Sequence, residues 1–109
     1  MEKDKIYAQH ILDAITAIGK FIADKDYASF SGDQLLQDGI IRELEIIGEA
    51  SKNISVEFKI SIPNLPWKDI AGMRDKLVHG YFSVDMDAVW KAATTDIQAL
   101  KSELIKNLG

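Results

Sequence analysis

Apolar side chains recur every three or four residues in the first part of the chain. Between about Lys5 and Asp24 they share one face of a helix: Tyr7, Ile11, Ala14, Ile15, Ile18 and Ile22. The opposite face carries polar side chains, namely Gln9, Asp13, Thr16 and Lys20. This period predicts an amphipathic helix. We expect a loop through Tyr27–Gly32 after it and a new helix starting at Gly32-Asp33.

The second predicted helix, about Asp33 to Asn53, is apolar over more than half of its circumference. Its apolar side chains are Leu35, Leu36, Ile40, Ile41, Leu44, Ile46 and Ile47. The remaining surface is one narrow polar stripe of Asp38, Arg42, Glu45, Glu49 and Lys52. A helix that is apolar on so many sides is buried from several directions. We therefore expect it to serve both the core and a partner chain.

The segment from Ser55 to Pro66 has a less regular pattern. Apolar side chains alternate with polar ones, at Val56, Phe58, Ile60 and Ile62, as they do in a strand. A lone strand has no pairing partner here, so we predict a short helical turn and a loop. Pro66 suits the first turn of a third helix, about Trp67 to His79, and Gly80 suits its left-handed C-terminal cap.

The last predicted helix, about Met86 to Leu108, has the clearest apolar stripe. Asp85 or Ser83 can cap its start. The stripe consists of Met86, Val89, Trp90, Ala93, Ile97, Leu100, Leu104 and Leu108. Four helices with short connections predict an all-α, antiparallel four-helix bundle with a short extra helical turn. We expect one domain over residues 1–109.

Composition narrows the classes of function. The chain has no cysteine, which excludes disulfides and thiolate metal sites and suits the cytoplasm. We expect a soluble protein, because no signal-peptide pattern and no membrane-spanning apolar run occurs. The net charge is −4, and only two of 13 basic residues are arginines, Arg42 and Arg74. Such a chain does not coat phosphates, so it meets RNA at a local site or by pooling surfaces with a second copy.

The third predicted helix combines groups that can perform chemistry. Arg74 falls in the middle of its apolar stripe, which consists of Trp67, Ile70, Ala71, Leu77 and Val78. A guanidinium in that position must either form an ion pair or serve a function of the protein. On the adjacent flank, Asp75 and His79 are one helical turn apart, so the carboxylate can orient the imidazole. Tyr81 follows directly after Gly80.

A structural interpretation competes with the chemical one. Arg74 can form a buried salt bridge with Glu45 or Glu49, and His79 is favoured at a helix end by the helix dipole. Arg42, Glu45 and Glu49 are most simply an ion network on the helix surface. We interpret His10 as a surface or core-edge residue, and Trp67 and Trp90 as packing anchors. No metal site is expected, because the two histidines are far apart and no close acidic triad has ligand spacing.

Three blocks of the sequence resemble one known family. The run Gly72–Tyr81, with an Arg, a polar residue, three further residues, a His, one residue and a Tyr, resembles the signature of the HEPN superfamily and of its HepT-like toxins. Arg42–Ala50 resembles the second-helix block of that family. Ile62–Ile70 resembles the segment that leads into the motif. Together the blocks cover nearly the whole chain in the family order.

The resemblance implies a homodimer of helical bundles whose Arg-His motifs face a shared cleft. It implies RNA cleavage without metal or cofactor, with Arg74 and His79 as catalytic residues and Asp75 as their support. In such a reaction His79 can move the proton of a ribose 2′-hydroxyl, and Arg74 can stabilise charge on the phosphorane oxygens. Glu45 and Glu49 are candidates for supporting contacts. Neither DNA nor a membrane is expected as a partner.

The resemblance also implies a regulatory partner. In the HepT-like toxins a nucleotidyltransferase antitoxin adenylylates the motif tyrosine, which is Tyr81 here. Two other functions compete with the toxin ribonuclease. One is a non-catalytic HEPN-like nucleotide-binding or protein-interaction module, which the low basic content favours. The other is a structural subunit that only holds the nucleotidyltransferase.

Overall fold

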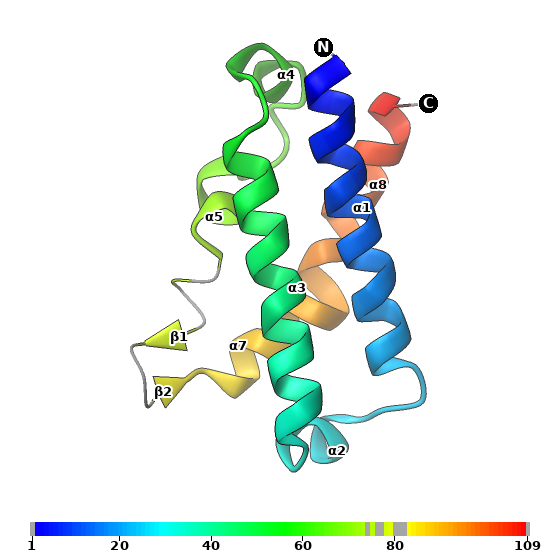
Figure 1. Cartoon of the computed structure of the whole chain (residues 1–109), viewed down its shortest axis with the longest axis vertical. Coiled ribbons are helices and arrows are strands. Elements are labelled where there is room, and N and C mark those ends of the chain that lie inside the picture. The colour runs from blue at the N-terminus through cyan, green and yellow to red at the C-terminus, as the bar shows by residue number, and fades with distance from the viewer. Residues whose placement is uncertain (1, 74, 76–77, 80–82, 109) are drawn as a thin grey trace.

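The computed structural model describes residues 2–73, 75, 78–79 and 83–108, with only the backbone of 78–79 and 83–84. Its helices, labelled in Figure 1, are α1 (Glu2–Ile22), α2 (Tyr27–Ser31), α3 (Gln34–Lys52), α4 (Val56–Ser61), α5 (Trp67–Ala71), α7 (Met86–Lys91), the π-helical η1 (Ala92–Asp96) and α8 (Ile97–Leu108). Two short strands, β1 (Val78–His79) and β2 (Ser83–Val84), pair with each other.

The long helices form an antiparallel bundle. In Figure 1, α1 runs opposite to α3 and to the segment α7–η1–α8, while the short α5 lies beside α3. The interior is built from the predicted apolar stripes of α1 and of the last helix, including Ile11, Ile15, Ile18, Val89, Ala93, Ile97, Leu100 and Leu104. Ile40, Leu44 and Ile47 of α3 are also fully buried. The prediction of an all-α fold is confirmed.

Side-chain caps explain where several helices begin. Asp33 accepts a hydrogen bond from the backbone N–H of Leu36 at 3.1 Å, and Asp85 accepts one from Ala88 at 3.0 Å. Each satisfies a backbone donor that has no partner within its own helix. The helix start at Asp33 is therefore as predicted, and Asp85 rather than Ser83 caps the last helix. The predicted short turn after Ser55 is α4.

The predicted loop through Tyr27–Gly32 is wrong for most of its length, because residues 27–31 form α2. Asp26 caps this helix by accepting from the N–H of Ser29 at 2.8 Å. Phe30 is fully buried, with its ring centroid 5.0 Å from that of Trp90. A five-residue helix is too short to be stable alone, so burial of Phe30 is what stabilises it.

The third predicted helix is interrupted and ends earlier than predicted. α5 ends at Ala71 with Gly72 as its C-cap, and residues 73 and 75 are helical again before the strand at 78–79. Val78–His79 is a strand paired antiparallel with Ser83–Val84, so the predicted helix up to His79 is wrong at its C-terminal end. Glycine disfavours helix continuation, and β-branched valines on both strands favour the extended pairing. The predicted cap at Gly80 lies outside the described residues.

The last helix contains an irregular turn that the sequence pattern does not reveal. Residues 92–96 form the π-helical η1 between α7 and α8. The hydroxyl of Thr94 donates to the backbone carbonyl of Trp90 at 2.7 Å in this region. Among the helices of the described residues, none is long and apolar enough to cross a membrane.

Candidate functional site

The polar stripe of α3 is built from ion pairs between neighbouring turns. Arg42 Nη1 lies 2.8 Å from Glu45 Oε1, and Lys52 Nζ lies 3.2 Å from Glu49 Oε1. The side chains of Arg42 and Glu49 are each 67% exposed. Pairs this exposed contribute about 0–1 kcal/mol each, so these side chains can exchange partners at little cost.

Gly48 allows α5 to approach the middle of α3 closely. A Cβ atom at this position would lie 3.2 Å from the backbone oxygen of Ala71 and 3.4 Å from that of Ile70. Backbone atoms cannot move aside as a flexible side chain can. The glycine therefore sets how near the end of α5, and the chain that follows it, lies to the polar stripe of α3.

A cleft of about 400 Å³ lies between α3 and the end of α5. Its lining residues, which define the α3–α5 cleft, are Arg42, Glu45, Gly48, Glu49, Lys52, Ala71 and Asp75. Three carboxylates proposed from the sequence as supporting groups, those of Glu45, Glu49 and Asp75, thus line a single cleft. Spacing along the chain does not predict this proximity, because it depends on the contact at Gly48.

The structure tests the other predicted site residues only in part. Arg74 and Tyr81 lie outside the described residues, and His79 is described only by its backbone in β1. The expected placement of Asp75 and His79 one turn apart on a helix is wrong, because His79 is on a strand. Asp75 itself is exposed and lines the cleft. The catalytic roles of Arg74 and His79 stay predictions.

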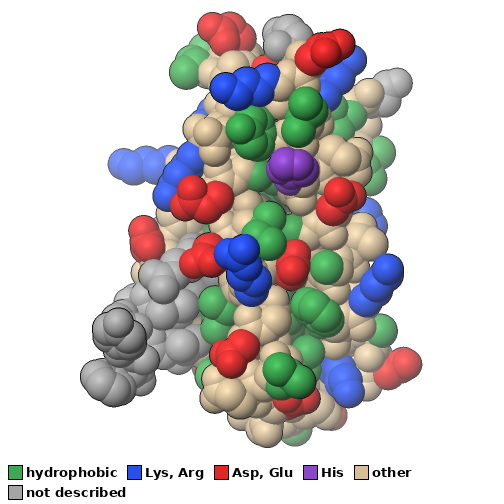
Figure 2. Space-filling view, viewed as in Figure 1, with side chains coloured by type: hydrophobic (Ala, Val, Ile, Leu, Met, Phe, Trp, Pro, Cys, Tyr) green, Lys and Arg blue, Asp and Glu red, His purple; other side chains and the backbone are tan. Residues whose placement is uncertain are grey.

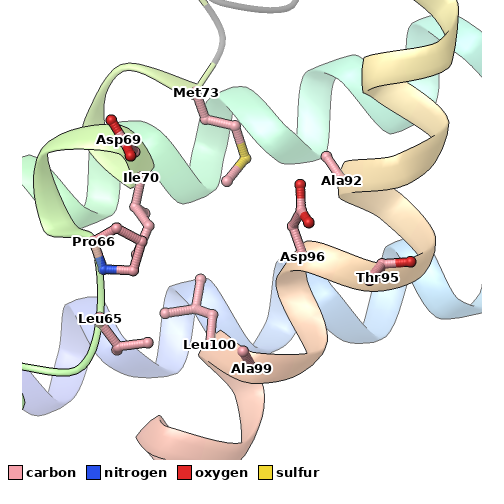
Figure 3. A pocket seen from close by; sticks show the side chains of 10 residues that line it. All are labelled: Leu65, Pro66, Asp69, Ile70, Met73, Ala92, Thr95, Asp96, Ala99 and Leu100. Carbon is pink, nitrogen blue, oxygen red and sulfur yellow. The ribbon is translucent and has the colours of Figure 1, made fainter.

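A second, mainly apolar cavity of about 470 Å³ was not expected from the sequence. It lies between α5 and the segment η1–α8, and its lining is shown in Figure 3. Asp96 points into it from η1, on the side of Met73. The cavity lies between elements that are far apart in the sequence, which the periodic pattern along a single helix does not reveal. No catalytic set gathers there.

Asp4 is the buried carboxylate of the described residues, and it fastens α1 to α4. It is 2% exposed, and its two oxygens accept hydrogen bonds from the backbone N–H and the hydroxyl of Ser55, both at 2.7 Å. The backbone bond, followed by the hydroxyl bond, lowers the pKa of Asp4. Ser55 in turn accepts from the N–H of Phe58 at 3.1 Å and so caps α4. This contact anchors the segment that leads to α5.

Comparison with known proteins identifies relatives along almost the full chain. The model of the family described as "Ribonuclease HepT-like" matches residues 11–106. A Thermococcus cleftensis protein named "Probable ribonuclease HepT" is 45% identical over 102 residues, which cover 94% of this chain and 93% of that protein. A "Putative RNase" of Caldanaerobacter subterraneus is 36% identical over 104 residues, 95% of this chain and 93% of that protein.

One relative is longer than this chain. A Methanocaldococcus jannaschii protein named "Gamma-glutamylcyclotransferase and putative RNase" is 45% identical over 107 residues. The match covers 97% of this chain but only 48% of that protein, so the chain spans about half of its length. No solved structure is a significant match. The extent of the family match and the identities above show that the chain belongs to the ribonuclease HepT-like family.

Proposed function

We propose that this chain is a metal-independent endoribonuclease toxin of a toxin–antitoxin pair, with Arg74 and His79 as its catalytic residues. One observation carries the proposal beyond family membership. Asp75, the neighbour of Arg74 in the sequence, lines the same cleft as Glu45 and Glu49. A member of a ribonuclease family therefore has, next to Asp75, a cleft lined by three carboxylates together with Arg42 and Lys52, and carboxylates are the groups that can hold a further guanidinium.

The proposed reaction uses the RNA's own 2′-hydroxyl. His79 accepts the proton of that hydroxyl while its oxygen attacks the adjacent phosphorus. The bond from phosphorus to the 5′-oxygen breaks, and the leaving oxygen takes up a proton from a second imidazole or from water. Arg74 stabilises the charge that builds on the non-bridging oxygens. The products are a 2′,3′-cyclic phosphate and a 5′-hydroxyl.

The carboxylates of the α3–α5 cleft support this chemistry by holding the catalytic guanidinium in place. Glu45, Glu49 and Asp75 line one cleft with Arg42 and Lys52, and the exposed pairs Arg42–Glu45 and Lys52–Glu49 are weak enough for the carboxylates to attract and orient a further guanidinium. This role replaces the helical Asp75–His79 pair expected from the sequence. Substituting Glu45 or Glu49 with Gln should therefore weaken catalysis by misplacing Arg74, and it should not remove a proton-transfer group.

Two copies of the chain are proposed to share the cleft. α3 carries more apolar surface than the core uses, because Leu35 is 84% exposed and Ile41 is only half-buried. A two-fold interface would cover this surface and bring both motifs together. A nucleotidyltransferase antitoxin would neutralise the toxin by adenylylating Tyr81, which adds negative charge and a bulky nucleoside beside Arg74.

The test is cleavage of total RNA by the purified protein in EDTA. His79→Ala should lower the rate by roughly 10²–10⁴-fold, and Arg74→Ala should do comparable damage. Arg74→Lys should not restore the full rate, because an ammonium lacks the bidentate fork. Lys101→Ala, which removes an exposed cation from α8, is the matched control. Full activity in the His79→Ala protein would contradict the proposal.

A non-catalytic nucleotide-binding or protein-interaction module is the second candidate. Its support is the surface charge: in Figure 2, acidic and basic side chains are intermixed on the face of α1 and α3, with no continuous basic area. The same RNA assay separates the two functions, because the module leaves RNA intact.

A further inference from the structure

A second groove adjoins the α3–α5 cleft on the other side of α3. It lies between α1 and α3 and measures about 260 Å³. Its lining residues, which define the α1–α3 groove, are Tyr7, His10, Arg42, Ile46, Glu49, Ala50 and Asn53. Arg42 and Glu49 line both hollows, so the groove and the cleft adjoin each other at the polar stripe of α3.

The groove contains an aromatic pair. The rings of Tyr7 and His10 have centroids 5.8 Å apart and planes at 86°. In an edge-to-face pair each ring covers at most one face of the other, which leaves ring surface for a further planar group. Tyr7 is half-buried and His10 is exposed, so the pair is anchored at one end and accessible at the other. Figure 2 shows a histidine among hydrophobic and charged side chains on this face.

The polar groups of the groove favour a particular kind of planar group. One N–H of the Asn53 side-chain amide donates to the backbone oxygen of Glu49 at 2.9 Å, so the other N–H and Oδ1 are the groups that Asn53 can offer a ligand. The carboxylate of Glu49 is also an acceptor. Acceptors beside an aromatic surface suit a nucleobase with an amino group. The volume is below that of drug-sized ligand pockets, which fits one base and not a whole cofactor.

Arg42 connects this base to the reaction centre. Its side chain is 67% exposed, and among the hydrogen bonds of the described residues its guanidinium is held by the surface pair with Glu45. Such a pair is weak, so Arg42 can turn to a phosphate at little cost. A phosphate at Arg42 would lie between the two hollows that this side chain lines.

We infer that the α1–α3 groove is an RNA subsite, which takes one unpaired, amino-bearing base from the nucleotide that is joined, through one further linking phosphate, to the dinucleotide step cleaved in the α3–α5 cleft. The inference rests on the proposed ribonuclease function. It assigns Tyr7 and His10 to stacking, Asn53 and Glu49 to the base edge, and Arg42 to the linking phosphate. Local stacking explains how a chain of net charge −4 can hold RNA without a basic surface.

Two substrates test the subsite by kinetics. One is an adenosine-rich oligonucleotide, and the other is a dinucleoside monophosphate too short to fill both hollows. His10→Ala should raise KM for the oligonucleotide about tenfold, the usual effect of losing one stacked base, with kcat unchanged. It should leave the dinucleotide rate unaltered. Lys101→Ala, which removes an exposed cation from α8, should behave like the unsubstituted protein on both substrates.

A binding assay keeps the inference testable without cleavage. A fluorescent 2′-O-methyl oligonucleotide, which lacks the attacking hydroxyl, should bind about tenfold more weakly to His10→Ala, and oligo-A should bind more tightly than oligo-U. If neither the unsubstituted protein nor its variants cleave RNA, but His10→Ala still weakens this binding, the proposed ribonuclease function is refuted while the groove remains supported as an RNA-binding site. Unchanged binding overturns the subsite. So does a shift of the monomer–dimer equilibrium in His10→Ala by analytical ultracentrifugation, which would show that a second copy covers the groove.

Discussion

Replacing Gly48 with alanine tests the contact that places α5 and its following residues beside the polar stripe of α3. The added methyl group would lie 3.2 Å from the backbone oxygen of Ala71, closer than ordinary van der Waals contact. The neighbouring atom is backbone, so the strain is relieved only if α5 moves away from α3. That movement would widen the α3–α5 cleft and shift Asp75 away from Glu45.

Two opposing effects determine the size of the change. Alanine is preferred over glycine in a helix interior by about 1 kcal/mol. Overpacking a closely packed site costs about 1–3 kcal/mol. The net expectation for Gly48→Ala is a free energy of unfolding lower by up to about 2 kcal/mol. RNA cleavage should fall further than this loss of stability explains, because the cleft changes shape.

Urea unfolding of Gly48→Ala alongside Gly19→Ala measures the effect. Gly19 is exposed on α1, and a Cβ atom there would have no neighbour within 4 Å. Gly19→Ala should therefore raise the free energy of unfolding by up to about 1 kcal/mol, the helix preference alone. If Gly48→Ala is stabilised as much as Gly19→Ala, the close packing of α5 on α3 is refuted.

Three further predictions concern other parts of the molecule. The pKa of Asp4 is lower in the folded protein than in the unfolded chain, where it is about 3.9, so its bonds to Ser55 stabilise the fold above pH 4. This contribution is lost as the pH falls through the folded-state pKa. Asp4→Asn should therefore lower the free energy of unfolding at pH 7 and make urea unfolding less dependent on acid pH. Tyr27→Phe removes the hydroxyl that donates to Asp87 and should lower the melting temperature in calorimetry; an unchanged value would refute a stabilising tie between α2 and α7. Tyr81→Phe should stay ribonucleolytic but escape the cognate nucleotidyltransferase, so normal growth of cells that make both proteins would argue against Tyr81 as the control point.

Much of the fold follows from periodicity and caps. The stripes of α1 and of the last helix run over many turns, and Asp33 and Asp85 mark starts with side chains suited to capping. Short elements are different, because tertiary contacts decide them. α2 depends on burial of Phe30 against Trp90, which are far apart in the sequence. The end of the third helix depends on strand pairing, which competes with an apolar pattern that continues past Gly72.

The sequence predicts which residues belong to the candidate site, but it predicts less well how these residues are arranged in space. The apolar surroundings of Arg74 in the sequence marked the motif, and the polar stripe of α3 supplied Glu45 and Glu49 as partners. Their proximity to Asp75 comes from the glycine contact between α3 and α5, which no spacing reveals. The same limitation applies to the α1–α3 groove, since Tyr7 and His10 gain significance only from the residues that α3 places opposite them.

The most direct test of metal-independent RNA cleavage uses one synthetic RNA in two forms. The site of cutting is mapped first, and a second copy is made with a 2′-O-methyl group on the ribose before that site. In EDTA, the protein should cut the unmodified RNA to a 2′,3′-cyclic phosphate and a 5′-hydroxyl, and the methylated copy should stay intact at that position. Cleavage of the methylated copy, or activity that appears only when a divalent metal ion is added, would contradict the account.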